Sequence, residues 1–188
     1  MAKTISGTGR SYYAQFPAPL DLYALVRLTK PKTLTESGVS SGVSTTFMLL
    51  GTRTNETGVL HSIDYPVPRT SKLGGGMWGI PDGLSSGWGV PAALRRDWDL
   101  RIGRSEDILK PLLYELGRLD FYCHDSPVDV KHFEFEMKAI RRHLGPGSVV
   151  VADNTYWETF ASTAESLGAH AIRRKGSSLG AFRVPVPR

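Results

Sequence analysis

Short strand patterns alternate with helix patterns along most of this 188-residue chain, and this alternation constrains the fold more than any other feature. The clearest strand is the apolar run at residues 148–152, which is typical of a parallel strand buried on both faces. The clearest helix spans residues 106–116 and places five leucine or isoleucine side chains on one face. Alternating strands and helices predict a doubly wound α/β sheet.

The other elements repeat this order along the chain. We expect further strands at residues 33–36, 58–64, 98–102, 119–124, 170–175 and 181–187, and further helices at residues 20–28, 43–50, 127–144 and 156–167. The turn at residues 176–180 joins the last two strands into a β-hairpin. A closing antiparallel hairpin is unlike the plain dinucleotide-binding fold.

Local signals predict where some of these helices begin and end. Gly51 is expected to close the second helix, and the Gly-Pro-Gly sequence at residues 145–147 to stop the fourth. Ser126 is expected to be the N-cap of that fourth helix, with Pro127 at its first position and Asp129 completing a capping box.

The size and composition of the chain favour one domain. Its 40% hydrophobic residues suffice for a core, so we expect a single domain over residues 1–188. The sequence has no run of 18 apolar residues, and its first six residues lack the apolar stretch of a signal peptide, so we expect a cytoplasmic protein. The single cysteine, Cys123, is expected to be a buried structural thiol.

The net charge of +5 originates in the C-terminal part of the sequence. No acidic residue follows Glu165, whereas five basic residues do: Arg173, Arg174, Lys175, Arg183 and Arg188. A basic edge attracts phosphates, which favours a nucleic-acid partner. We prefer a second interpretation, in which the charges keep a solvated terminal hairpin from pairing edge to edge with other strands.

Residues 66–93 differ in composition from the rest of the chain. Seven glycines are interleaved there with prolines and with tryptophans such as Trp78 and Trp88. So long a stretch without regular structure inside a compact domain indicates a functional loop or lid.

The residues that carry chemistry follow the strands, where α/β sheets bind their ligands. A glycine loop, Glu-Ser-Gly-Val-Ser-Ser-Gly-Val-Ser at residues 36–44, joins the first strand to the next helix, and Gly38 and Gly42 allow the backbone to approach a ligand closely. Asp64 ends the second strand and can accept two hydrogen bonds from vicinal ribose hydroxyls. Taken separately, the loop is also compatible with a structural turn and Asp64 with a turn-forming acid.

The Gly-x-x-x-Gly spacing after an acid resembles the first motif of class I S-adenosylmethionine-dependent methyltransferases. The resemblance covers the chain from about residue 20 to its end. It implies a Rossmann-like doubly wound seven-stranded sheet, mostly parallel with an antiparallel C-terminal β-hairpin. It also implies that S-adenosylmethionine is bound by Glu36, Gly38, Ser40, Gly42, Asp64, Ser105, Glu106 and Asp125. In this scheme Glu36 lies near the ammonium group of the cofactor, and Ser105 and Glu106 lie near its adenine.

Asp125 after the fourth strand, with Asp153 and Asn154 after the fifth, resembles the magnesium ligands of metal-dependent small-molecule O-methyltransferases. The similarity extends to the catechol O-methyltransferase branch and to the macrolide methyltransferase and cephalosporin hydroxylase-like branch. It implies a Mg²⁺ ion that lowers the pKa of an acceptor hydroxyl and orients it.

These branches carry a lysine or a histidine three residues after the first metal-binding acid, where this chain has Val128. The expected base is therefore absent from its usual position. Beside Asp125, the candidates for a catalytic role are Lys131, His132 and His124.

The sequence thus predicts methyl transfer from S-adenosylmethionine to an oxygen nucleophile of a small-molecule substrate, with magnesium as an assisting ion. One alternative is a nucleic-acid methyltransferase, or a non-catalytic nucleic-acid-binding module, that uses the basic hairpin. Another is a nicotinamide-dependent oxidoreductase on a related fold. No membrane partner is expected, and a homo-oligomer is left open.

Overall fold

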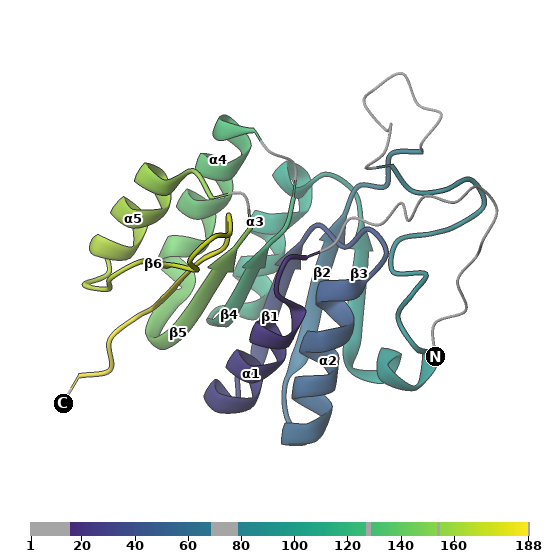
Figure 1. Cartoon of the computed structure of the whole chain (residues 1–188), viewed down its shortest axis with the longest axis horizontal. Coiled ribbons are helices and arrows are strands. Elements are labelled where there is room, and N and C mark those ends of the chain that lie inside the picture. The colour runs from purple at the N-terminus through teal and green to yellow at the C-terminus, as the bar shows by residue number, and fades with distance from the viewer. Residues whose placement is uncertain (1–15, 69–78, 127–128, 154, 188) are drawn as a thin grey trace.

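The computed structural model describes residues 16–68, 79–126, 129–153 and 155–187. Within these residues, seven strands form one sheet in the order β3-β2-β1-β4-β5-β7-β6 (Figure 1). They are β1 (Thr33–Ser37), β2 (Val59–Asp64), β3 (Trp98–Ile102), β4 (Leu119–His124), β5 (Leu144–Ala152), β6 (Ile172–Arg173) and β7 (Gly180–Arg183). Strands β1 to β5 are parallel, β7 is antiparallel to β5, and β6 is antiparallel to β7. The predicted fold class is confirmed.

Helices cover both faces of this sheet (Figure 1). One face carries α1 (Pro19–Thr29) and α2 (Val43–Asn55), and the other carries α3 (Ser105–Leu116), α4 (Val130–Ile140) and α5 (Trp157–Glu165). Two short 3-10 helices, η2 (Ala92–Asp97) and η3 (Arg141–His143), precede β3 and β5. No helix in the described ranges combines the length and the apolar character needed to cross a membrane.

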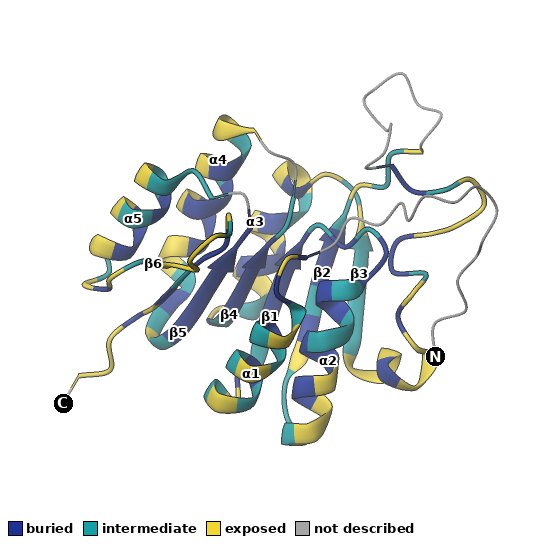
Figure 2. Ribbon diagram, viewed as in Figure 1, coloured by how far each residue is buried: buried dark blue, intermediate teal, exposed yellow. Residues whose placement is uncertain are grey.

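Two hydrophobic cores lie on opposite faces of the sheet, with the buried strands between them (Figure 2). Leu34 of β1 and Met48 of α2 belong to one core, and Tyr122 of β4 and Phe133 of α4 belong to the other. Because a central parallel strand is covered on both faces, its side chains are apolar without alternation, as the sequence of β5 predicted.

Helix α2 runs past its predicted end. The prediction that Gly51 closes this helix is wrong, since α2 continues to Asn55. A Cβ atom on Gly51 would lie 2.7 Å from Cγ1 of Val26 in α1. The glycine therefore permits close packing of two helices and does not mark a helix end.

Helix α4 begins later than predicted, and Ser126 is not its N-cap. The N-cap is Asp129, whose carboxylate accepts a hydrogen bond from the backbone N–H of His132 at 2.9 Å. Pro127 lies outside the described residues. The hydroxyl of Ser126 instead lies 3.3 Å from the carboxylate of Glu136. The predicted capping box of Ser126 and Asp129 is therefore wrong, because Asp129 itself is the N-cap.

The Gly-Pro-Gly sequence at residues 145–147 lies inside β5 and does not stop a helix. Helix α4 already ends at Ile140, and η3 leads into the strand. Pairing between β4 and β5 shifts its register at this place, where Leu119 faces Leu144 but Phe121 faces Val149. The glycines and the proline thus form an irregular first half of β5.

Candidate methyl-donor site

The strand order of the sheet reverses between β1 and β4, which is where α/β sheets bind their ligands. Backbone hydrogen bonds join the segments that leave the strands there. The N–H of Gly38 donates to the carbonyl of Ile63 at 2.9 Å, and the N–H of Asp125 donates to the carbonyl of Ser37 at 2.8 Å. The ends of β1, β2 and β4 therefore meet at one place, as predicted.

The glycine loop turns sharply between β1 and α2, with positive φ angles at Gly38 (85°), Ser40 (47°) and Gly42 (89°). A Cβ atom on Gly38 would lie 2.0 Å from the backbone oxygen of Asp125, and one on Gly42 would lie 2.4 Å from a methyl group of Val90. Both glycines are thus required by contacts within the protein itself, a reason that the sequence did not reveal.

Glu36 lies beneath this loop and is completely buried. Its carboxylate accepts hydrogen bonds from the hydroxyls of Thr45 and Ser62, each at 2.7 Å, and from the hydroxyl of Ser44. Burial raises its pKa to about 7, although the three hydroxyl donors act in the opposite direction. Glu36 therefore links the first turn of α2 to β1 and β2, a structural role that differs from the predicted contact with a cofactor ammonium group.

Asp64 lies at the end of β2, beside the glycine loop. Its Oδ1 atom accepts a hydrogen bond from the backbone N–H of Val39 at 3.2 Å, and its Oδ2 atom accepts one from the hydroxyl of Ser86. Ser86 belongs to the glycine- and tryptophan-rich stretch that the sequence predicted to be a functional loop. Of that stretch, residues 69–78 lie outside the described residues.

Ser105 and Glu106 begin α3, and both lie close to His132 of α4. The Nδ1 and Nε2 atoms of His132 each lie 3.1 Å from a carboxylate, those of Glu106 and Glu136 respectively, and Nε2 lies 3.3 Å from the Ser105 hydroxyl. The hydrogen bond to Glu136 is the main cause that raises the pKa of His132 to about 9. A doubly protonated ring donates hydrogen bonds and accepts no proton, which argues against His132 as a base.

Glu136 of α4 is a second completely buried carboxylate, and the sequence analysis did not predict it as a site residue. It accepts hydrogen bonds from the hydroxyls of Ser37 and Tyr122, both at 2.8 Å, and its Oε2 atom lies 2.6 Å from Nδ1 of His124. Burial favours a raised pKa, but the hydrogen bonds and charges of His124 and His132 outweigh it and lower the pKa of Glu136. A signal was present, because Glu136 falls on the apolar stripe of α4.

Asp125 and Asp153 follow adjacent strands, β4 and β5. Burial, and next the nearby charge of Asp153, raise the pKa of Asp125 well above its usual range. The carboxylate of Asp153 accepts a hydrogen bond from the hydroxyl of Ser178. A divalent cation fits the chemistry of this pair, since it would offset the repulsion between the two carboxylates.

The described ranges contain no group of three or more His, Cys, Asp or Glu residues arranged as a metal site. Asn154, the third predicted ligand, lies outside those ranges. Lys131 is exposed and lines a surface pocket between α3 and α4, together with residues such as Tyr114 and Arg142. The structure therefore does not bring Lys131 together with Asp125.

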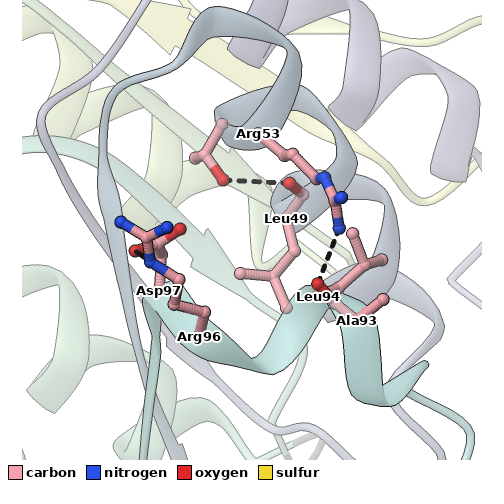
Figure 3. Close-up of a pocket in the computed structure, with 7 residues that line it drawn as sticks. Leu49, Arg53, Ala93, Leu94, Arg96 and Asp97 are labelled. Atoms are coloured by element: carbon pink, nitrogen blue, oxygen red, sulfur yellow. Dashed lines mark hydrogen bonds and ion pairs between the residues drawn. The ribbon is translucent and has the colours of Figure 1, made fainter.

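A second small pocket, of about 180 Å³, lies between α2 and η2 (Figure 3). Arg53 crosses it and donates a hydrogen bond to the carbonyl of Ala93 at 2.7 Å. Since η2 leads into the first residue of β3, this pocket lies at the end of the sheet where strands begin. It is separate from the glycine loop and Asp64.

Comparison with known proteins agrees with this geometry. A family profile described as a methyltransferase domain matches residues 35–155, which is more than half of the chain and includes the glycine loop, Asp64 and Asp125. The chain belongs to this methyltransferase family. The sequence matches no curated protein.

Solved methyltransferases share the fold at low sequence identity. The O-methyltransferase of Bacillus cereus, in complex with S-adenosylhomocysteine (SAH), is 16% identical with a TM-score of 0.65, over 94% of this chain and 84% of that chain. TomG of Streptomyces achromogenes, an O-methyltransferase of tomaymycin synthesis in complex with SAM, is 20% identical with a TM-score of 0.61, over 93% and 82%. An SAH-bound methyltransferase of Podospora anserina is 16% identical with a TM-score of 0.62, over 93% and 81%.

Proposed function

We propose that this chain transfers the methyl group of S-adenosylmethionine to an oxygen atom of a small molecule. The observation that carries the proposal is the meeting of the glycine loop with two acids. The Val39 N–H donates to Asp64 at 3.2 Å, and Gly38 passes directly against the backbone of Asp125. The SAH and SAM complexes of similar O-methyltransferase folds support the same choice of cofactor.

Each part of the cofactor has candidate partners in this site. Asp64 would accept hydrogen bonds from the ribose hydroxyls, and Ser105 and Glu106 would lie near the adenine. The backbone N–H groups of the α2 N-terminus, which follows the loop, would face the carboxylate of the amino-acid part. When bound, S-adenosylmethionine supplies an electrophilic methyl group on its sulfonium.

For the acceptor, we propose Asp125 as the residue that receives its proton or that holds Mg²⁺ together with Asp153 and Asn154. Once ionised, a carboxylate whose pKa is raised by burial is a stronger base than a surface carboxylate, which favours Asp125 as the proton acceptor. His132 is bonded through both ring nitrogens, and Lys131 faces a different pocket, so neither is retained as the base.

Titration calorimetry with SAH tests this function. The wild-type chain should bind SAH and should not bind NAD. Asp64→Ala should weaken SAH binding by about 100-fold, since two hydrogen bonds to a charged group are lost. Asp97→Ala, which removes an exposed aspartate of η2, is the matched control and should change nothing. Binding of NAD without SAH would contradict the proposal.

The nucleic-acid alternative receives little support. Among the basic residues of the hairpin, Arg174 pairs with Asp21 at 2.9 Å, and the Arg173 guanidinium lies 4.4 Å from the ring centroid of Trp157. Partners within the chain thus already occupy two of these charges. The single-domain organisation and the cytoplasmic location remain predictions.

A further inference from the structure

Residues 79–91, which belong to the described part of the glycine-rich stretch, are called the cover segment below. It is hydrogen-bonded to the glycine loop: the Gly87 N–H donates to the carbonyl of Ser40 at 2.7 Å, and the Gly89 N–H donates to that of Ser41 at 2.9 Å. Its Val90 side chain fills the space that a Cβ on Gly42 would need. The cover segment is therefore part of the same site as the loop.

The cover segment is also held from its other side. The guanidinium of Arg95 donates to the carbonyls of Gly87, at 2.9 Å, and Val90, at 3.1 Å. The ring of Trp98 packs so closely on Gly87 that a Cβ there would lie 2.3 Å from it. These contacts fix the backbone immediately after Ser86, whose side chain is 3% exposed.

This fixed backbone directs the Ser86 hydroxyl at Oδ2 of Asp64, while the Val39 N–H occupies Oδ1. An ionised carboxylate has about four lone-pair positions, two on each oxygen. Since the described residues place one donor on each oxygen, one acceptor position on each is left by them. That arrangement suits two neighbouring hydroxyls, as in the vicinal diol of a ribose.

We propose that Ser86 is a positioning residue for recognition of a vicinal diol: together with Val39 it orients Asp64, so that both free acceptor positions face the 2′- and 3′-hydroxyls of a nucleoside. This inference rests on the proposed function, since the nucleoside is that of the methyl donor. What the inference adds is a role for Ser86 of the cover segment. Through its hydrogen bond to Asp64, this residue would help the site to distinguish a ribose from a 2′-deoxyribose.

Titration calorimetry with two probes tests this inference: SAH, and its analogue that lacks the 2′-hydroxyl. The wild-type chain should bind SAH at least about tenfold more tightly than the 2′-deoxy analogue, since one hydrogen bond to a charged group is lost. Ser86→Ala should weaken SAH binding by about tenfold but binding of the analogue by less than about threefold. Ser85→Ala, at the exposed neighbouring position, is the matched control and should alter neither affinity.

Three results would overturn the inference. Equal wild-type affinities for the two probes would mean that the vicinal diol is not recognised. An equal loss of affinity for both probes in Ser86→Ala would show that Ser86 only supports the fold, and an unchanged SAH affinity would show that it has no role. Absence of SAH binding by the wild type would contradict the proposed function itself, whereas the other results leave that function standing.

Discussion

Two glutamates are completely buried next to β1, and their pKa values are shifted in opposite directions. Glu36 of β1 faces α2 and, among the described residues, accepts hydrogen bonds only from neutral hydroxyls; burial raises its pKa to about 7. Glu136 of α4 is bonded to the hydroxyl of the next residue of β1, Ser37, but also to His124 and His132, and its pKa is lowered. Burial therefore decides the charge of a carboxyl only where no cation accompanies it into the core.

The two glutamates support different parts of the candidate site. Glu36 ties the start of α2 to β1 and β2, directly below the glycine loop. Glu136 connects α4 to β4 through its hydrogen bond with Tyr122. It also contacts Ser37, which precedes Gly38, and Ser126, which follows Asp125. Neither contact was apparent from sequence spacing, because each joins elements that are distant along the chain.

Removal of Glu136 should have the largest effect. Glu136→Ala leaves the buried His124 without its carboxylate partner and removes one of the two carboxylates that pair with the half-buried His132. We expect it to lower the free energy of unfolding by about 3–5 kcal/mol. Urea unfolding near neutral pH measures this loss. The control Glu134→Ala removes an exposed glutamate of the same helix and should stay within about 0.5 kcal/mol of the wild type. Equal effects of the two variants would contradict the comparison.

Glu36 should impose a pH dependence of stability. Its folded-state pKa of about 7 lies above the ordinary value of 4.5, so the folded state favours the protonated carboxyl. This contribution to stability is complete below the ordinary value and is lost as pH rises through the folded-state pKa. Because Glu36→Gln cannot titrate, its stability relative to the wild type should increase by about 3 kcal/mol between about pH 5 and about pH 8.

Urea unfolding of both proteins at the two pH values measures this change. Glu158→Gln, at an exposed position of α5, is the control and should show no such increase. A difference between Glu36→Gln and the wild type that is constant across this range would show that Glu36 is already ionised in the folded protein.

His132 should give the smallest of the three effects. Its pKa is raised from 6.5 to about 9, so its contribution to stability is complete below the ordinary value and is lost as pH rises through the raised one. His132→Gln should cost about 1 kcal/mol near pH 6 and almost nothing near pH 10, as measured by urea unfolding. The control His170→Gln lies at an exposed position. An equal cost at both pH values would show that the His132 charge has no part in the Glu136 network.

The sequence predicted the sheet well because short strand patterns alternate with helix patterns along the chain, and two strands, β3 and β4, have the predicted bounds. The prediction failed where a residue that resembles a local helix signal is instead required by a contact between distant elements. The sequence predicts a helix end at Gly51, but this glycine allows α1 to pack on α2. It predicts a cap at Ser126, but this serine contacts Glu136. Such contacts leave no periodic trace in the sequence.

The same limit applies to the site. The order of strands predicts that Gly38, Asp64 and Asp125 lie close together, because the carboxyl ends of parallel strands share one edge. The contact between Ser86 and Asp64 had no comparable signal, since Ser86 lies in a stretch without regular structure. The burial of Glu36 was equally hidden, because its hydroxyl partners come from α2 and β2.

A crystal structure of the chain with SAH and Mg²⁺ tests the proposed site most directly. We expect the ribose hydroxyls on Asp64, the amino-acid part along the glycine loop, and the metal between Asp125 and Asp153, with Glu36 still covered by Ser44, Thr45 and Ser62. SAH bound away from the glycine loop, with Asp64 still bonded only to Val39 and Ser86, would contradict the assignment of this site to the methyl donor.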